Sequence, residues 1–467
     1  MNDNEVSSLR LEREDTEGIA RVSPPRMLCV GRSTQADFVI ADDPQVSAMH
    51  FRLDYHESAW RIHDLESSNG TYVNGERVRA GVVRDEDRIV AGNTAFRVRV
   101  ERRASQASDV ALDVSAVDED RARIPRVDTI PPFVVGTAYS EDQNGVAWLS
   151  VVVKGTWTID ERPVSATSPV PIFISDQLAS DDPSSPVRFE SDLVPFKPRA
   201  DVVLVGHAYA PSRESVTQLF AGLRVGQLSH AVAVFGDREW HSHSSQLPTF
   251  SAPRPFAAME LVYERAFGGI DGPAGMYCME NLVGTGFIGK NTRERVDGLR
   301  LPNLEDRRNL ITSWESHPSP VGFGFYGRGW MPRLAYAGTY DEKYVGSRYP
   351  LPPVDFSYRF FNGAHPDLQV DGYLCGDEEV TLLNVCPETA DMRFRLPGLV
   401  PRVAVGRWNR SPDLGLGEPP LTYEPIATVL DTLVFMPDEG VFYEVFRGRC
   451  RLASLDSLEI AQIIVRA

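Results

Sequence analysis

Hydrophobic and polar residues alternate in short runs along much of the chain, and glycine, proline and other turn residues separate the runs. A period of two is typical of β-strands that bury one face. In the first hundred residues the runs are 27–30, 38–40, 50–53, 60–63 and 96–100. They predict a compact all-β unit over residues 26–100.

Longer β-type runs follow in the rest of the chain, at 145–159, 201–209, 223–235 and 380–385. Residues 130–467 are therefore expected to form a large β-rich domain with few helices. A short helix is expected at the end of the chain, with Ser454 as its N-cap. In this helix Leu455, Leu458, Ala461 and Val465 would share one face.

Two segments lack the large apolar residues that a folded core needs. Residues 1–25 are polar and charged, which predicts a disordered arm, and residues 101–129 contain no aromatic residue. Such a segment cannot offset its own ordering entropy. We therefore expect residues 101–129 to be a flexible linker between the two β domains.

Composition and charge narrow the class of protein. The chain has 467 residues, and 48 Lys and Arg against 65 Asp and Glu give a formal charge of −17, which argues against a nucleic-acid partner. The five cysteines include no CxxC pair, and no apolar run resembles a signal peptide or a membrane span. We expect a cytoplasmic protein with no membrane partner.

Three sequence elements in the first unit have a recognisable order. They are Gly31-Arg32, Ser47-x-x-His50 and Asp64-x-x-Ser67-Ser68-Asn69-Gly70-Thr71-Tyr72-Val73-Asn74-Gly75. Arginine's planar guanidinium can donate to two phosphate oxygens at once, and serine hydroxyls add further donors. The Asn74-Gly75 pair predicts a two-residue hairpin turn. Loops gathered at one end of a β-sandwich can bring such donors together into one anion site.

These elements resemble the forkhead-associated (FHA) domain, an antiparallel β-sandwich that reads phosphothreonine peptides. The resemblance implies phosphate contacts from Arg32, Ser47 and Ser68, and a contact from Asn69 to the peptide backbone. The residues that the resemblance implies as structural support for the binding loops are Gly31, His50, Gly70, Thr71, Asn74 and Gly75.

Residues 130–467 resemble otherwise uncharacterised domains found in type VI secretion loci, whose members act as effector adaptors or chaperones. The phrases that carry this resemblance are 197–202 with Gly206, 236–240, 264–269, 301–305, 337–341, 355–362, 376–378 and 382–384. Tyr358, Arg359 and Phe360 form a candidate partner surface, with packing in the core as the alternative.

No catalytic residue, cofactor or metal site is predicted. Residues 284–291 imitate a phosphate-binding GxxxxGK loop, but Asn291 replaces the serine or threonine that holds magnesium. His241 and His243 lack a third ligand. An enzyme acting near Glu264, Asp355 or His241 remains an alternative.

The sequence thus favours a non-enzymatic adaptor that binds a phosphothreonine-containing kinase target through its first domain. The partner of the second domain would be a type VI secretion effector or spike component. A further alternative is a scaffold of a threonine-kinase pathway unrelated to secretion.

Overall fold

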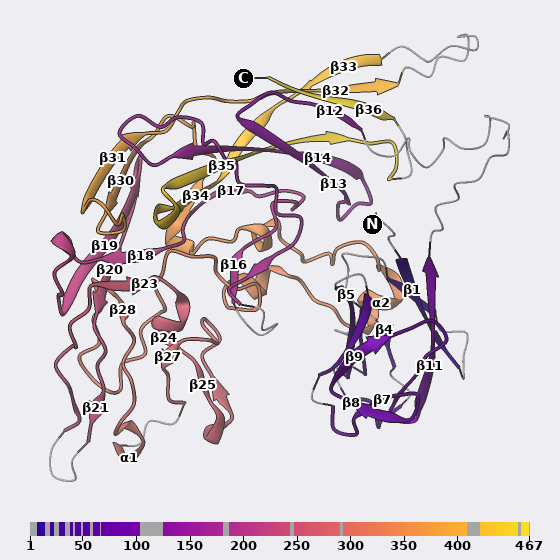
Figure 1. The fold of residues 1–467 in the computed structure, drawn as a ribbon, viewed down its shortest axis with the longest axis horizontal. Coiled ribbons are helices and arrows are strands. Elements are labelled where there is room, and N and C mark those ends of the chain that lie inside the picture. Colours follow the sequence, from indigo (N-terminus) through magenta and orange to yellow (C-terminus); the bar gives the residue numbers. More distant parts are fainter. Residues whose placement is uncertain are drawn as a thin grey trace. The chain divides into compact units, whose positions relative to one another are not determined.

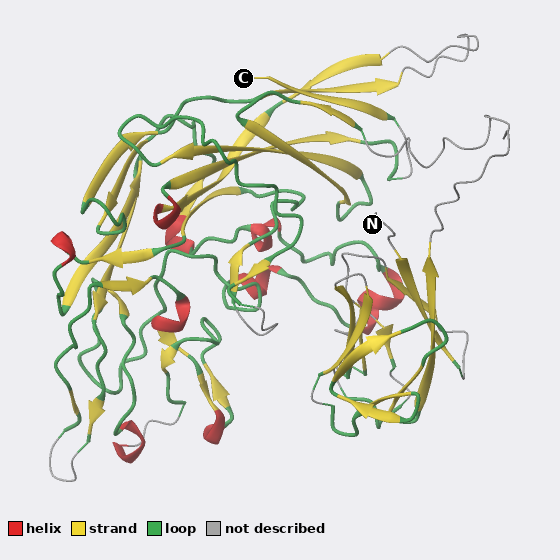
Figure 2. Cartoon of the chain, in the orientation of Figure 1, coloured by secondary structure: helices red, strands yellow, loops and turns green. Residues whose placement is uncertain are grey.

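The structure is a computed structural model of the whole chain, and its regular structure is mostly β, with very few helices (Figure 1, Figure 2). The residues that it describes are 7–14, 19–22, 28–32, 38–40, 43–47, 50–56, 59–65, 67–102, 125–180, 186–242, 247–289, 293–408, 421–455 and 459–466. The chain forms two compact units, Met1–Ser115 and Ala116–Ala467. Most of the predicted linker, residues 103–124, lies outside the described residues.

The first unit is a sandwich of two sheets, as predicted. One sheet has the order β2-β1-β11-β10-β7-β8, and the other has the order β4-β3-β5-β6-β9. Leu11 and Phe96 from the first sheet meet Phe51 and Trp60 from the second in one buried core. The strands are β1 (Ser7–Arg13), β2 (Ile19–Val22), β3 (Leu28–Gly31), β4 (Phe38–Val39), β5 (Phe51–His56), β6 (Ala59–Asp64), β7 (Thr71–Val73), β8 (Glu76–Val78), β9 (Ala80–Val83), β10 (Arg88–Ala91) and β11 (Thr94–Arg102).

The prediction of a disordered arm over residues 1–25 is wrong for its described residues. β1 pairs with β11 along its whole length, and β2 pairs with β1. Leu9 and Leu11 are buried in the sandwich core, while Arg10 and Glu12 alternate with them. Two leucines at strand spacing are enough to anchor this segment as a strand, because the neighbouring strand β11 supplies the backbone hydrogen bonds.

The second unit is built on three larger sheets. A six-stranded sheet has the order β13-β14-β35-β34-β17-β29, a five-stranded sheet β28-β20-β19-β30-β31 and a four-stranded sheet β12-β36-β32-β33. Their strands are β12 (Arg126–Asp128), β13 (Phe133–Glu141), β14 (Ala147–Thr158), β17 (Arg199–Leu204), β19 (Gln218–Val225), β20 (Leu228–Phe235), β28 (Leu304–Asp306), β29 (Gln369–Asp371), β30 (Glu379–Leu383), β31 (Asp391–Arg395), β32 (Arg402–Trp408), β33 (Leu421–Ile426), β34 (Thr428–Met436), β35 (Val441–Arg451) and β36 (Ile460–Arg466).

Five two-stranded pairs and short helices connect these sheets. The pairs are β15 (Gln177–Leu178) with β16 (Val187–Phe189), β18 (His207–Tyr209) with β23 (Ala258–Glu260), β21 (Trp240–His241) with β22 (Thr249–Phe250), β24 (Phe267–Gly268) with β27 (Thr285–Gly286), and β25 (Ile270–Asp271) with β26 (Met276–Tyr277). The α-helices are α1 (Arg293–Val296) and α2 (Glu342–Ser347), and the 3₁₀ turns are Pro211–Arg213, Tyr263–Arg265, Gly272–Ala274, Arg333–Tyr336, Tyr358–Phe361, Pro366–Leu368 and Pro437–Glu439. In the described part of the chain, no helix has the length and apolar character to cross a membrane.

Each predicted run in this unit contains a strand, but two of the runs are interrupted. The run 201–209 is divided between β17 and β18, and the run 223–235 contains the hairpin turn between β19 and β20 at Gly226, whose φ is 54°. β14 is buried on nearly every residue because both of its faces are covered. An uninterrupted apolar run is the pattern expected of such a strand.

The predicted C-terminal helix is wrong, because β36 occupies residues 460–466 as a strand. It pairs antiparallel with β32 and parallel with β12. Ile460, Ile463 and Val465 are buried in the core. The β-branched residues of this segment fit a sheet better than a helix. Pairing with β32 and β12 therefore outweighs the helical spacing of the apolar residues.

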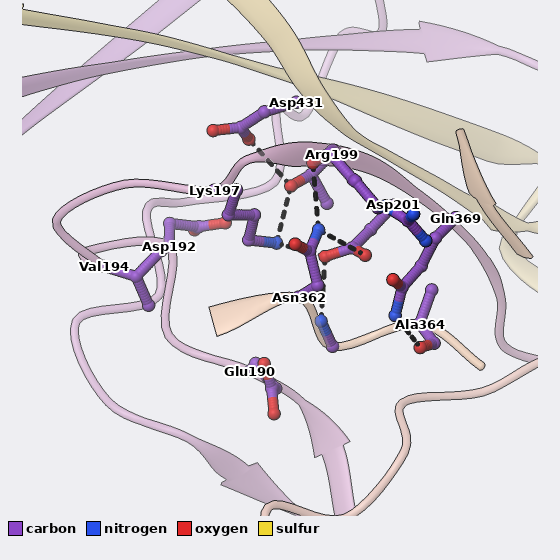
Figure 3. Close-up of polar contacts among 12 residues, drawn as sticks. Glu190, Asp192, Val194, Lys197, Arg199, Asp201, Asn362, Ala364, Gln369 and Asp431 are labelled. Atoms are coloured by element: carbon purple, nitrogen blue, oxygen red, sulfur yellow. Dashed lines mark hydrogen bonds and ion pairs between the residues drawn. The ribbon is translucent and has the colours of Figure 1, made fainter. Parts of the chain in front are cut away.

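Buried charges connect three strands of the six-stranded sheet, β17, β34 and β35, to two loop segments (Figure 3). We call Lys197, Asp201, Asn362, Thr432, Asp431 and Arg447 the Asp201 cluster. The Lys197 ammonium donates to an Asp201 carboxylate oxygen and to the Thr432 hydroxyl, each at 2.8 Å. The Asn362 amide and the Gly363 backbone N–H also donate to the Asp201 carboxylate, at 3.0 and 2.8 Å. Two cations therefore balance two carboxylates in this interior.

We expect Asp201→Ala to lower the free energy of unfolding by about 3–5 kcal/mol, because it leaves the buried Lys197 charge without its partner. Asp371→Ala is the matched control. Asp371 pairs with Arg199 at 2.7 Å but is 84% exposed, so its loss should cost less than about 1 kcal/mol. Urea denaturation of the full chain measures both. Equal losses in the two variants would contradict a supporting role for the cluster.

Candidate functional site

Arg32 lies directly after β3, at the end of the sandwich where the predicted loops gather. Its backbone N–H donates to the Ser47 carbonyl at 2.9 Å, and its Nε donates to the Val46 carbonyl at 3.2 Å. The residue is exposed, and no carboxylate of the described residues lies within 4 Å of its guanidinium. Two contacts thus hold the side chain while its terminal nitrogens remain available to a ligand.

His50 connects two of the loops from a buried position. Its Nδ1 accepts the Ser47 backbone N–H at 3.0 Å, and its Nε2 lies 3.2 Å from the Gly70 carbonyl. An accepting Nδ1 leaves Nε2 to carry the proton and donate it, so the ring is neutral in this arrangement. Burial lowers the pKa of His50 below its ordinary value. The imidazole therefore braces the loops and does not face a ligand.

Ser47, Ser68 and Asn69, which were predicted to contact the ligand, lie on neighbouring loops. The Ser47 hydroxyl oxygen accepts the Ser68 backbone N–H at 2.9 Å, which brings the second and third loops into contact. The Asn69 side-chain amide donates to the carbonyl oxygens of the Gln45 backbone and side chain, at 2.7 and 2.9 Å. Gln45 therefore holds Asn69 in place, although it was not among the predicted site residues.

Asp64 organises the start of the third loop. Its carboxylate accepts hydrogen bonds from the hydroxyls of Ser67 and Thr71, both at 2.5 Å, and from the Ser67 N–H at 3.1 Å. Partial burial acts to raise the pKa of Asp64, but the hydrogen bonds from Ser67 and Thr71 outweigh it and lower that pKa. The loop therefore forms around a carboxylate whose hydrogen-bonding capacity is already used.

The Asn74-Gly75 hairpin is present as predicted. Both residues have positive φ, 52° and 88°, and they connect β7 to β8. The Asn74 side chain also accepts the Arg88 N–H at 2.9 Å and donates to Asp87 at 2.7 Å. Asn74 and Gly75 support the sheet behind the loops.

A second buried carboxylate, Asp43, was not predicted. It accepts from the Gln45 N–H at 2.9 Å, the Asn93 N–H at 2.7 Å and the Thr94 hydroxyl at 2.8 Å. These bonds tie the loop that carries Ser47 to the turn between β10 and β11. Asp43 matches no sequence element with a known role, and Asn93 and Thr94 lie about fifty residues further along the chain. The sequence therefore offered no signal for Asp43.

Unpaired positive charge borders these loops. A hollow of about 700 Å³ is lined by Asp64, Ser67, Arg77, Val78 and Arg79. The Arg77 guanidinium lies against Gly70, where an added Cβ would be 2.4 Å from its Nε. Neither Arg77 nor Arg79 has a carboxylate partner among the described residues. Arg77 and Arg79 thus add two guanidinium groups beside the third loop, next to the Asp64 carboxylate.

The candidate partner surface in the second unit is half-buried. The Tyr358 ring packs edge-on against Phe196, with centroids 5.5 Å apart, and the Arg359 guanidinium lies 4.6 Å from the centre of the Tyr336 ring. The Phe360 carbonyl accepts a hydrogen bond from Arg333 at 2.8 Å. These contacts favour the packing alternative for all three residues.

The residues of the enzyme alternative do not share one cavity in the described part of the chain. Glu264 lines two hollows, and neither Asp355 nor His241 lines them. The Asp355 carboxylate instead accepts the N–H and hydroxyl of Thr339, at 3.0 and 2.7 Å. His243, Lys290 and Asn291 lie outside the described residues.

Comparison with known families gives a class to each unit. Residues 28–92 match the model of the FHA domain, and the loops described above are those of this domain. Residues 144–447 match the family described as "Uncharacterized protein conserved in bacteria (DUF2169)". This match spans more than half of the chain, so the protein belongs to that family and carries an FHA domain before its family region. None of the curated proteins compared with the chain matches it.

Solved structures are similar to the first unit. The first FHA domain of Mycobacterium tuberculosis Rv1747 is 28% identical over 20% of this chain and 97% of its own, with a TM-score of 0.19. The FhaA FHA domain, solved with the intracellular domain of Rv3910, is 27% identical over 20% and 99% of the two chains, also at 0.19. M. tuberculosis EmbR with a low-affinity phosphopeptide is 27% identical over 20% and 24%, again at 0.19.

The pKa of His50 makes a pH dependence testable. In the unfolded chain a histidine titrates near pH 6.5, whereas the folded unit keeps His50 neutral to lower pH. Its contribution to stability is therefore complete above about pH 6.5 and is lost as the pH falls. We expect the free energy of unfolding of residues 1–115, followed by fluorescence of its one tryptophan, Trp60, to fall between pH 7.5 and 5.5.

His50→Gln should flatten this slope, because glutamine does not titrate. His63→Gln is the control, since His63 belongs to the same unit and lies on β6. An unchanged slope in His50→Gln would contradict the neutral, bracing imidazole.

Proposed function

We propose that this protein is a phosphothreonine-dependent adaptor, in which the FHA domain binds a phosphorylated protein. The observation that carries the proposal is the convergence of three loops on Arg32. No carboxylate of the described residues pairs with the Arg32 guanidinium, and the Ser47 hydroxyl, which accepts from the Ser68 N–H, keeps its own proton to donate. A dianionic phosphate would accept from both groups.

The same loops account for peptide binding next to the phosphate. Asn69 is fixed by Gln45, so its carbonyl oxygen faces a ligand at little entropic cost. Arg77 and Arg79 add positive charge beside this loop. Together these groups suit an anionic, phosphorylated peptide and repel a basic one.

Arg32→Ala should weaken binding of a phosphothreonine peptide at least about tenfold. Hydrogen bonds to a charged group contribute roughly 1.5–3 kcal/mol each, and about 1.4 kcal/mol is a factor of ten in affinity. Titration calorimetry of the full chain with phosphorylated and unphosphorylated versions of one peptide measures the effect.

The control is Arg84→Ala. Arg84 is exposed and directly follows β9. Its neighbour Val83 pairs with Trp60, and Asp64 lies at the other end of β6 from Trp60. Its loss removes the same charge without touching the loops. Equal affinities of the Arg32→Ala and wild-type chains, or equal binding of both peptides, would overturn the site assignment.

The family region supplies the second half of the proposed adaptor. We propose that it holds a type VI secretion effector or spike component without phosphorylation, acts as an adaptor or chaperone in effector loading, and catalyses no reaction. The resemblance of its sequence phrases motivates the secretion role. The half-buried state of Tyr358, Arg359 and Phe360 directs the search for its binding surface elsewhere in the unit.

A fragment of residues 116–467 is expected to co-purify from the native host with the same secretion component as the full chain. The full-length Arg32→Ala variant should retain this component and lose only the phosphorylated partner. Quantitative mass spectrometry of the three purifications makes the comparison. Turnover of a substrate by the fragment, or absence of secretion components from all three purifications, would favour the enzyme or kinase-scaffold alternative.

A further inference from the structure

Three of the family region's sequence phrases meet at one hollow in the second unit. The hollow is about 430 Å³ in volume, and its lining residues include Glu260 at the end of β23 and Asn303 just before β28; Figure 1 labels both strands. Asp237, Arg238 and Glu239 come from the first phrase, Glu264 and Arg265 from the second, and Leu301 and Asn303 from the third. Segments more than sixty residues apart in the chain therefore form one concave surface.

Buried hydrogen bonds fix the base of this hollow before any ligand binds. Asn303 is 8% exposed; its side-chain amide donates to Asp237 at 3.1 Å, and its oxygen accepts from Arg265 at 3.1 Å. The Arg238 guanidinium forms a buried ion pair with Glu305 and donates to the Pro302 carbonyl at 2.8 Å. One residue from each phrase is thus tied to the next, so little conformational entropy would be lost on binding.

The rim of the hollow carries charges of both signs that do not pair with each other. Arg254 and Arg300 are exposed, as is Glu260, while Glu239 and Glu264 are half-buried. Among the described residues none of these five has an opposite charge within 4 Å. Partial burial raises the pKa of Glu264, so a cationic neighbour would stabilise the ionised form of this carboxyl group.

Residues 260–264, from the end of β23 into the 3₁₀ turn Tyr263–Arg265, form one wall. Glu260, Val262 and Glu264 point toward the hollow, while Leu261 and Tyr263 between them are buried in the core. The same three residues also line a second hollow of about 90 Å³, whose other walls include Arg188, His207 and Asp438. Glu260 ends β23, Val262 has extended backbone (φ −114°, ψ 155°) and Glu264 lies in the 3₁₀ turn that follows, so the two carboxylates flank a short extended stretch along which a peptide can lie.

Gly236 allows the opposite wall to come close. A Cβ at this position would lie 1.7 Å from the Arg254 carbonyl oxygen, so only glycine lets the segment with Arg254 pack against the end of β20. The Arg254 N–H donates to the Asp237 carbonyl at 3.1 Å. The arginine is therefore held at the rim by its backbone, and its guanidinium has no ion-pair partner among the residues that the structure describes.

We propose that this hollow binds an extended segment of a partner polypeptide that carries both acidic and basic side chains. Acidic side chains of the segment would pair with Arg254 and Arg300, and basic ones with Glu260 and Glu264. A purely anionic ligand would place negative charge next to the two carboxylates, which repel it. A purely cationic ligand would place positive charge next to the two arginines, which repel it as well. The inference rests on the proposed partner-binding role of the family region and assigns that role to a site.

The test uses the full chain and four fluorescent sets of twelve-residue peptides without phosphate: mixed-charge, acidic, basic and neutral. The mixed-charge set is expected to bind most tightly, and its binding should weaken as salt screens the charges. The double change Arg254→Glu with Arg300→Glu should weaken it at least tenfold, and Glu260→Lys should weaken it as well. All three residues are exposed, so unfolding midpoints should stay at the wild-type value.

Arg393→Glu is the matched control. Arg393 is 73% exposed on β31, the edge of the five-stranded sheet opposite β28, which is four strand spacings or roughly 19 Å away. Its reversal should change affinity less than twofold. Equal binding of acidic and mixed-charge peptides, no binding by any set, or unchanged binding by the Arg254→Glu, Arg300→Glu chain would overturn the inference.

Failure of the site and failure of the proposed function give different results. If secretion components co-purify with residues 116–467 but the Arg254→Glu, Arg300→Glu chain captures them equally, the hollow is not the binding site and the adaptor role survives. If no secretion component co-purifies with the wild-type chain while mixed-charge peptides bind the hollow, the site survives and its proposed partner class is wrong.

Discussion

The buried carboxylate of Asp201 is the constraint on which the second unit depends. Asp201 lies on β17, between β34 and β29 in the six-stranded sheet, with no exposed surface. Its oxygens accept from Lys197, from Asn362 and from the Gly363 N–H. A buried charge is tolerated only where partners surround it, so the segments that carry these donors must reach β17 for the unit to fold.

The same physical rule repeats where the candidate binding hollow is built. Arg238 and Glu305 are both buried, and their ion pair closes the base of the surface that Asn303 organises. The charges at the base form an ion pair within the protein, whereas in the described part of the chain no opposite charge lies within 4 Å of Arg254 or Glu260 at the rim. A rigid base beneath charged rim residues suits binding. The sandwich loops have a similar arrangement, in which buried side chains hold the loops and the guanidinium of Arg32 is exposed.

Local chemistry made much of the fold and of the first site predictable from the sequence. Asn74-Gly75 specifies a tight turn by backbone conformation alone, and each predicted β-type run contains a strand, among them the long β14 and β20. Interactions between distant segments were not predictable: Asp43 reaches Thr94, and Asp201 reaches Asn362. The expected helix at the C-terminus failed for a similar reason, because the partner strands β12 and β32 are remote in sequence from β36.

The central claim is that one chain holds two different proteins at once, and only one of them through phosphate. Native mass spectrometry of the full-length complex purified from its host, before and after phosphatase treatment, tests this claim most directly. We predict a three-protein assembly that loses one partner with phosphatase and keeps the other. Loss of both partners, or of neither, would contradict the account.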